Sequence, residues 1–541
     1  MTNLQERQAY ANAQGLLWPV ALVMAAALLI RFHGLGAPSF WLDEAYSAWF
    51  SARDWTYLWT EVPQFETHPS FYYSLLKLWR VFGTDEFTLR IPSVLFNVAT
   101  IPLVALSARL CSDRRTGRSA AILAAILFAG SATQVYAAQE ARPYALMTLA
   151  MAVALTSALA VMTARARAGA PMHRLLARDR KMALAFAGIG IGIALLAWSH
   201  NFGPVFGLIL GACLFAWWLS EGAPRGLLVN LLLSAGLAAL LYAPNIPILL
   251  MQTRSLGAEG FWLEPPGPRA VASAILELPL GHSRSEGAVI LLFAALSSLV
   301  ALSGLAGMMS QKERPPLAVP VTLVVLATVP AILSFAGSHM GQPIFLFRTF
   351  QASQLPVLIS LAFAPLALRP LLPARWRWTA PAVPLLLAAT ALWSAPPGKP
   401  RWSDENWRDF TRRMAEAPVP AKLVVYPAEA EMPLLYYGDR LGLPLDIAAV
   451  PGHYPVRGAE YSYPAGGGGS PGMTPGILSG TMANLAGDAR VWIVTRGLDT
   501  YDPAGLFMTR MQREFPCLLD DTMPRIELRS RVSPDGSCPG S

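Results

Sequence analysis

Charged residues are scarce in this sequence. They make up 14% of the 541 residues, roughly half of the 25% that is usual for globular proteins. So low a charge content excludes a disordered chain and a charged coiled coil. Together with 54% hydrophobic residues and a mean hydropathy of +0.41, it also argues against a soluble multidomain enzyme. The composition is that of an integral membrane protein.

The motifs of soluble enzymes are also missing. There is no Walker A loop, no dinucleotide fingerprint and no nucleophile elbow, and the 7 histidines and 4 cysteines lack zinc-site spacing. No internal repeat suggests the inverted halves of a transporter. The net charge of +8 comes from basic residues in short runs between apolar segments, so we expect no nucleic-acid partner.

What the chain does have is a series of long apolar segments. We expect about eleven membrane spans, at residues 16–33, 88–110, 119–136, 143–163, 183–200, 203–219, 227–246, 287–309, 318–336, 349–369 and 379–395. Basic residues concentrate in the connectors Cys111–Arg118 and Ala164–Lys181, which the positive-inside rule places in the cytoplasm. Alternation then places the loop 34–87 and the chain after about residue 396 outside. In a bacterium this is the periplasmic side of the inner membrane.

The hydropathy falls after residue 395. We therefore expect a transmembrane domain at 1–395 and a small α/β extramembrane domain at 396–541. The segments that predict its strands and helix are Leu423–Pro427, Val491–Thr495, Phe507–Phe515 and Ile526–Val532. The glycine-rich stretch Ala465–Gly476 predicts a mobile loop. Cys517 and Cys538 both lie in this domain, where an oxidising compartment permits a disulfide.

The first outside loop contains an acidic pair, Asp43 and Glu44, among aromatic residues. A carboxylate just outside the bilayer, partly desolvated by such neighbours, is suited to accept a proton from a hydroxyl. It is equally suited to hold a divalent cation, although no cofactor is certain from the sequence. The alternative is an interfacial acid with no role.

Other polar residues lie at the outer ends of the expected spans, where ionisable groups are functional candidates. Each has a plain structural alternative: an interfacial anchor, a mutual ion pair, a core histidine or a snorkelling arginine. These candidates are His68, Arg90, Glu140, Arg142, Tyr144, His200 and Arg348.

Five segments, in this order, carry a family resemblance: WLDEAYSAW, THPSFYYSLLKLW, FTLRIPSVLF, AAQEARPYAL and PIFLFRTFQASQLP. Together they resemble the bacterial membrane glycosyltransferases of family 39, which are related to protein O-mannosyltransferases and to the aminoarabinose transferase of lipid A. The resemblance covers roughly residues 15–370, and NWRDF at Asn406–Phe410 is similar to a tail motif of some members. It implies a polytopic α-helical protein with the C-type glycosyltransferase (GT-C) architecture.

The resemblance also implies an activity, the transfer of a sugar from a polyprenyl-phosphate donor to a lipid, glycan or protein acceptor on the outer face. Asp43 matches the family's first-loop acid and would be the general base, with Glu44 orienting it or the sugar. The step His68–Pro69 resembles an HPP segment of the O-mannosyltransferases, with Ser70 in place of the second proline. Arg90 matches an arginine that suits a phosphate.

Arg142 and Arg348 are further candidates for binding the lipid phosphate, and Glu140, Tyr144 and His200 for binding phosphate or sugar. The mechanism that follows is a single displacement with inversion, which needs no covalent nucleophile. As a membrane protein, the chain is also expected to contact membrane lipids. The main alternative is a lipid or polysaccharide transporter or flippase without transferase activity, and a second is a binding subunit that has lost catalysis.

Overall fold

The computed structural model describes residues 2–168, 180–259, 263, 265–279, 288–341, 343–399, 405–417, 421–456 and 472–538. The chain divides into two compact units. Unit 1 comprises Met1–Leu35, Arg90–Pro247 and Glu264–Lys399, and unit 2 comprises Gly36–Leu89, Ile248–Leu263 and Pro400–Ser541. Almost all of the first loop thus groups with the C-terminal segment, not with the long apolar helices.

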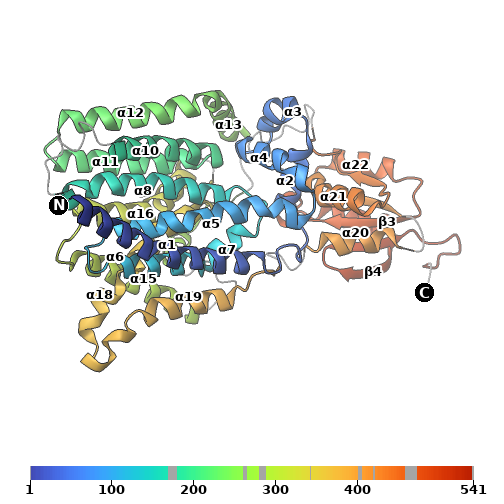
Figure 1. Ribbon diagram of the computed structural model, residues 1–541. Helices are drawn as coiled ribbons and strands as arrows, with labels where there is room; N and C mark the ends of the chain where they lie inside the picture. The colour runs from blue at the N-terminus through green and yellow to red at the C-terminus, as the bar shows by residue number, and fades with distance from the viewer. Residues whose placement is uncertain are drawn as a thin grey trace. The chain divides into compact units, whose positions relative to one another are not determined.

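Unit 1 is a bundle of apolar helices (Figure 1). Within it α8 packs against α10, α10 against α12, α11 against α16 and α1 against α6. The helices that form it, with α5 beginning a few residues earlier in unit 2, are α1 (Thr2–Phe32), α5 (Glu86–Leu110), α6 (Gly117–Ala129), α7 (Ala132–Ala138), α8 (Tyr144–Ala168), α10 (Arg180–Ser199), α11 (Gly203–Ser220), α12 (Arg225–Tyr242), α14 (Pro268–Leu276), α15 (Ala288–Met309), α16 (Ala318–Met340), α17 (Gln354–Leu361), α18 (Ala364–Leu368) and α19 (Ala382–Ser394).

The membrane character expected from hydropathy is confirmed. Among the described residues, 9 helices are long and apolar enough to cross a membrane, or up to 10 if the bent pair α6–α7 is one span. They match ten of the expected segments. The remaining segment, 379–395, contains α19, whose 13 residues extend only about 20 Å against the roughly 30 Å of hydrocarbon.

The α6–α7 pair is bent by 58°, and a buried arginine occupies the break. Arg31 donates a hydrogen bond to the carbonyl oxygen of Ala129, the last residue of α6, at 3.0 Å, and another to Oδ1 of Asn97 at 2.8 Å. A cation beside the last carbonyls of a helix is stabilised by the helix dipole, and these bonds satisfy backbone that the break leaves open. The charge of Arg31 therefore stabilises the helix bundle.

The connector Cys111–Arg118 lies against the short segment between α15 and α16. Gln311, between α15 and α16, accepts hydrogen bonds from the backbone of Asp113 at 2.8 Å and from the hydroxyl of Thr116 at 2.6 Å. Its amide nitrogen donates to the carbonyl of Cys111 at 3.0 Å. Of the basic connector Ala164–Lys181, residues 169–179 lie outside the described residues.

Unit 2 combines three helices of the first loop with a C-terminal α/β domain, and α2 packs against α21 although almost 400 residues separate them (Figure 1). Its helices are α2 (Leu42–Ala52), α3 (Trp55–Thr60), α4 (Phe71–Trp79), most of α13 (Ile246–Glu259), α20 (Trp407–Ala415), α21 (Glu431–Leu441), α22 (Pro475–Asn484), α23 (Leu498–Tyr501) and α24 (Leu506–Glu514). Its strands are β1 (Lys422–Tyr426), β2 (Ile447–Ala449), β3 (Arg490–Thr495), β4 (Cys517–Met523) and β5 (Ile526–Ser530).

The five strands form one sheet in the order β2-β1-β3-β5-β4. β1 pairs parallel with β2 and β3, while β5 pairs antiparallel with β3 and β4. The α/β character of this domain is therefore confirmed, and β1, β3, β5 and α24 coincide with the four segments predicted from the sequence. Val424 and Ile493 join Ile477 of α22 and Phe507 and Met511 of α24 in one apolar core.

A disulfide joins Cys517 to Cys538, with 5.5 Å between their Cα atoms. It ties the start of β4 to the segment that follows β5. Of the glycine-rich stretch predicted as a mobile loop, residues 465–471 lie outside the described residues, and α22 begins at Pro475.

Candidate functional site

The acidic pair lies in the first turn of α2. Glu44 is buried and Asp43 is half-buried, and negative charge in a first turn is favoured by the helix dipole. The residue at the N-cap, Trp41, provides no side-chain cap. Instead, Oε2 of Glu405, in the segment before α20, accepts the backbone N–H of Leu42 at 3.0 Å.

Glu405 belongs to a cluster of charges that faces α2. Its Oε1 accepts from Nε of Arg496 at 3.1 Å, and its Oε2 also accepts from the indole N–H of Trp407 at 3.1 Å. Nη1 of Arg496 lies 3.6 Å from Oε1 of the buried Glu429. Burial by itself would lower the pKa of Arg496, but the charges of Glu405, Glu429 and Asp43 outweigh it and raise that pKa.

The buried Glu429 has a raised pKa. Burial raises its pKa to about 7 against the attraction of Arg496, and the charge of Asp43 adds to the rise. The hydroxyl of Tyr501 lies 3.3 Å from both carboxylate oxygens, and Tyr46 of α2 is a further hydrogen-bond partner. This carboxyl group therefore keeps its proton to a higher pH than an exposed glutamate does.

Sequence reasoning does not single out Glu405, Glu429 or Arg496. A signal for two of them is present, because Glu429 and Arg496 closely follow the β-branched runs that predict β1 and β3. The carboxyl ends of adjacent parallel strands lie together at one edge of a sheet, which is where α/β domains place functional side chains.

His68 is held in its own loop, before α4. Its Nδ1 lies 2.6 Å from Oε1 of Glu66, and the same oxygen accepts the backbone N–H of His68 at 2.9 Å. The amide of Gln252 in α13 in turn donates to the carbonyl oxygen of Glu66 at 2.6 Å. Glu66, which the sequence did not single out, thus orients the imidazole.

The other predicted residues belong to unit 1. Arg90 and Arg142 are both buried, and Arg90 donates to the carbonyl oxygen of Leu35 at 2.7 Å. Ser93, one turn after Arg90 in α5, donates to the carbonyl oxygen of Arg142 at 3.3 Å. The structure therefore brings the segments that carry these two arginines together. Glu140, two residues before Arg142, is also buried.

Tyr144 and His200 also lie side by side, with ring centroids 6.0 Å apart. Nδ1 of His200 accepts the backbone N–H of Phe202 at 3.0 Å, so a neutral imidazole carries its proton on Nε2. Phe202 contacts Phe350, which lies two residues after the half-buried Arg348. This contact links the segments of His200 and Arg348.

Unit 1 also contains an apolar groove. It has a volume of about 490 Å³, and every side chain that lines it between α11 and α16 is apolar. Phe202, two residues from His200, and Ile344, four residues from Arg348, are both part of its lining. The segments that carry His200 and Arg348 thus each contribute one apolar residue to the lining of the groove.

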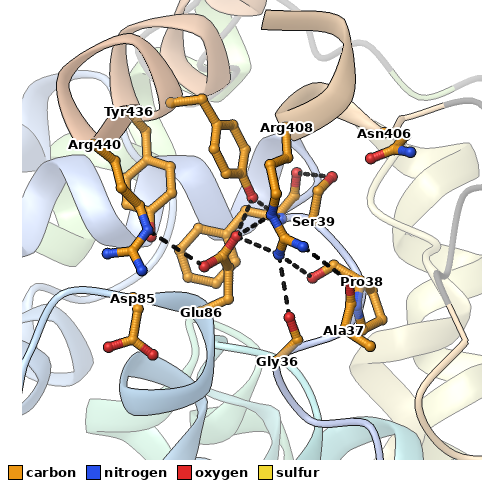
Figure 2. A network of polar contacts seen from close by, with 12 residues as sticks. Gly36, Ala37, Pro38, Ser39, Asp85, Glu86, Asn406, Arg408, Tyr436 and Arg440 are labelled. Atoms are coloured by element: carbon orange, nitrogen blue, oxygen red, sulfur yellow. Dashed lines mark hydrogen bonds and ion pairs between the residues drawn. The ribbon is translucent and has the colours of Figure 1, made fainter. Parts of the chain in front are cut away.

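The tail motif NWRDF connects the C-terminal domain to the first loop (Figure 2). Nε of Arg408 donates to Oε1 of the buried Glu86 at 2.9 Å, and the guanidinium also reaches the carbonyl oxygens of residues 36–38 at 3.1–3.5 Å. Tyr437 donates to the same Glu86 oxygen at 2.8 Å and accepts the backbone N–H of Phe40 at 2.6 Å. Burial lowers the pKa of Arg408, but Glu86 outweighs that effect and raises it.

The acidic pair is the place where the sequence permits a divalent cation. Within the part of the chain that the structure describes, there is no group of three or more His, Cys, Asp or Glu side chains that could hold a metal ion. The Asp43 region is a mixed cluster in which Arg496 lies among several acids.

Comparisons with known proteins identify the fold. No protein-family model and no curated protein matches the sequence. The structure is similar to ArnT from Cupriavidus metallidurans in the apo state, with a TM-score of 0.57 and 14% identity, covering 96% of this chain and 99% of ArnT. The same protein bound to undecaprenyl phosphate gives a TM-score of 0.53 and 15% identity over the same shares.

The oligosaccharyltransferase from Archaeoglobus fulgidus in the apo form is also similar, with a TM-score of 0.50 and 16% identity, covering 87% of this chain and 69% of that chain. Both neighbours are glycosyltransferases of the GT-C class. The chain therefore has the GT-C fold, as its sequence resemblance predicted.

Proposed function

We propose that this protein is a membrane glycosyltransferase that moves a sugar from a polyprenyl-phosphate donor to an acceptor on the outer face of a bacterial inner membrane. The observation that carries the proposal is that unit 1 contains both an apolar groove and buried arginines. A lipid phosphate has the same two-part chemistry, an apolar chain and an anionic head. The undecaprenyl phosphate bound to ArnT, a protein of similar fold, supports a donor of this class.

In the proposed reaction the acceptor hydroxyl or amine attacks the anomeric carbon while Asp43 takes its proton. The bond from that carbon to the phosphate oxygen breaks, and the electron pair leaves with the lipid phosphate. Because phosphate is already a good leaving group, the protein mainly positions the reactants and compensates charge. Attack from the side opposite the leaving group inverts the anomeric centre.

Arg90, Arg142 and Arg348 are proposed to bind the lipid phosphate. A guanidinium matches the oxygens of a phosphate with two parallel hydrogen bonds, and buried arginines lose less of this interaction to water than exposed ones. The neighbouring Tyr144 and His200 offer hydrogen bonds for the phosphate or the sugar, as does Glu140 for the sugar hydroxyls.

One observation favours the second candidate, a transporter or flippase. The broken pair α6–α7 is a feature that transporters use to bind ions or substrates. Here, however, the open backbone at the break is bonded to Arg31. We therefore retain the transferase as the first proposal.

The test uses the purified protein in nanodiscs with a panel of radiolabelled polyprenyl-phosphate sugars, measuring release of sugar and of lipid phosphate. Turnover of one donor supports the proposal and identifies the sugar. Translocation of labelled lipid across proteoliposomes without any turnover would favour the transporter. A reporter enzyme that is active only outside the cytoplasm, fused after residue 541, tests the proposed orientation.

A further inference from the structure

The C-terminal α/β domain has a topological switch point between β1 and β3. The chain leaves β1 for β2 on one side and then returns past β1 to β3 on the other. In open α/β sheets, functional groups and ligands lie outside the carboxyl ends of the strands at such a point. The residues in that position are Glu429, just after β1, and Arg496, directly after β3.

Both residues face α2 of the first loop. Arg496 bonds Glu405, and the other oxygen of Glu405 accepts the N–H of Leu42, the residue before Asp43. Tyr46, one helical turn after Asp43 and so on the same face of α2, is a hydrogen-bond partner of Glu429. The first turn of α2 is thus attached to the switch point on both sides of Asp43.

We propose that Arg496 is a positioning residue for Asp43, and that the switch point of the C-terminal domain is thereby a working part of the transfer site. This inference rests on the proposed transferase activity and on Asp43 as its base. Arg496 acts in two ways. Through Glu405 it fixes the N-terminus of α2, and through its charge it favours the ionised carboxylate that accepts the proton.

The two ion pairs of Arg496 fix the orientation of its guanidinium group. Glu405 and Glu429 hold the guanidinium at two of its nitrogens, Nε and Nη1. A planar guanidinium held in this way cannot rotate freely, whereas a lysine ammonium is a single point charge that does not bridge two carboxylates in the same geometry. The arrangement therefore predicts that charge alone does not replace Arg496.

The experiment compares Arg496→Lys and Arg496→Gln with the wild type, measuring kcat and the donor KM separately. We expect kcat to fall about tenfold for lysine and about 100-fold for glutamine, because small displacements of a reacting group have effects of this size. The donor KM should change little, since Arg496 does not bind the donor in this scheme. The partial activity of the lysine variant is the signature of positioning.

Arg413→Gln is the matched control. Arg413 forms an ion pair of 2.7 Å with Asp520 in the same domain, and its side chain is half exposed. This variant should keep the wild-type kcat.

A wild-type kcat in folded Arg496→Gln would overturn the inference. If the glutamine variant does not fold, a wild-type kcat in Arg496→Lys would do the same. Equal losses in Arg496→Lys and Arg413→Gln would assign Arg496 a purely structural role, which also contradicts the proposal. Failure of the proposed function is distinguishable, because the wild-type protein would then turn over no donor.

Discussion

Replacement of Arg408 by alanine is expected to release the beginning of the first loop from the C-terminal domain. Arg408 is the one side chain of the NWRDF motif that bonds both Glu86 and the carbonyl oxygens of residues 36–38 (Figure 2). These contacts lie a few residues before Asp43 in the chain. Their loss should therefore loosen the segment that leads into α2.

The size of the effect follows from the burial of Glu86. Its side chain is only 6% exposed, and removal of one partner from a buried ion pair costs about 3–5 kcal/mol. Glu86 keeps the hydroxyl of Tyr437 at 2.8 Å and Nε of Arg440 at 3.7 Å. The partial exposure of Arg408 reduces the cost further, so we expect the lower end of the range, about 3 kcal/mol.

Hydrogen exchange measured by mass spectrometry tests this directly. A local loss of about 3 kcal/mol corresponds to roughly 100-fold faster exchange. The informative amides are those of Phe40, bonded to Tyr437, and Leu42, bonded to Glu405. The control is Arg413→Ala, which breaks an exposed ion pair and should cost under about 1 kcal/mol. Equal exchange at Phe40 and Leu42 in the two variants would refute the reasoning.

Three more predictions follow from single features of the structure. Serine at both Cys517 and Cys538 should lower the free energy of unfolding of the C-terminal domain by about 3 kcal/mol, given the 21-residue separation. Chemical denaturation of this double variant and of the oxidised wild type measures the difference, and equal free energies of unfolding would contradict the prediction. The raised pKa of Glu429 means that its contribution to stability is present below its unfolded value of 4.5 and is lost as the pH rises through about 7. Glu429→Gln should therefore raise Tm more at pH 8 than at pH 4, and an equal shift at both would contradict this. Arg142→Gln and Arg348→Gln should each raise the donor Kd at least tenfold. The reason is that the loss of a charge-assisted hydrogen bond to phosphate weakens the free energy of binding by about 1.5–3 kcal/mol. Calorimetry with the lipid phosphate measures this change.

Much of the fold could be predicted from the sequence because hydropathy and strand patterns are local signals. The apolar segments predict the membrane helices, and the β-branched runs predict β1 and β3. β2 escaped prediction because it is only three residues long. β4 escaped because Asp520 and Asp521 interrupt its apolar pattern. α19 was expected to span because composition does not show where a helix ends.

The candidate site was only partly predictable for a related reason. Asp43 stands out locally, as an acid among aromatic residues after an apolar segment. Its surroundings do not, because Glu405, Glu429 and Arg496 come from more than 350 residues later and reach α2 only through the fold of the C-terminal domain. The partner of His68, Glu66, is close in sequence but has no distinctive spacing.

The most direct test of the account compares Asp43→Asn with the wild type in a transfer assay on a donor that the wild type turns over. Asp54→Asn is the matched control, because it makes the same change in charge in the same loop, at an exposed N-cap where asparagine is as good as aspartate. The account predicts that Asp43→Asn still folds and binds the donor with unchanged affinity, while its transfer rate falls by about 10²–10⁴. Asp54→Asn should transfer at the wild-type rate. Full transfer by folded Asp43→Asn would contradict the assignment of Asp43 as the base.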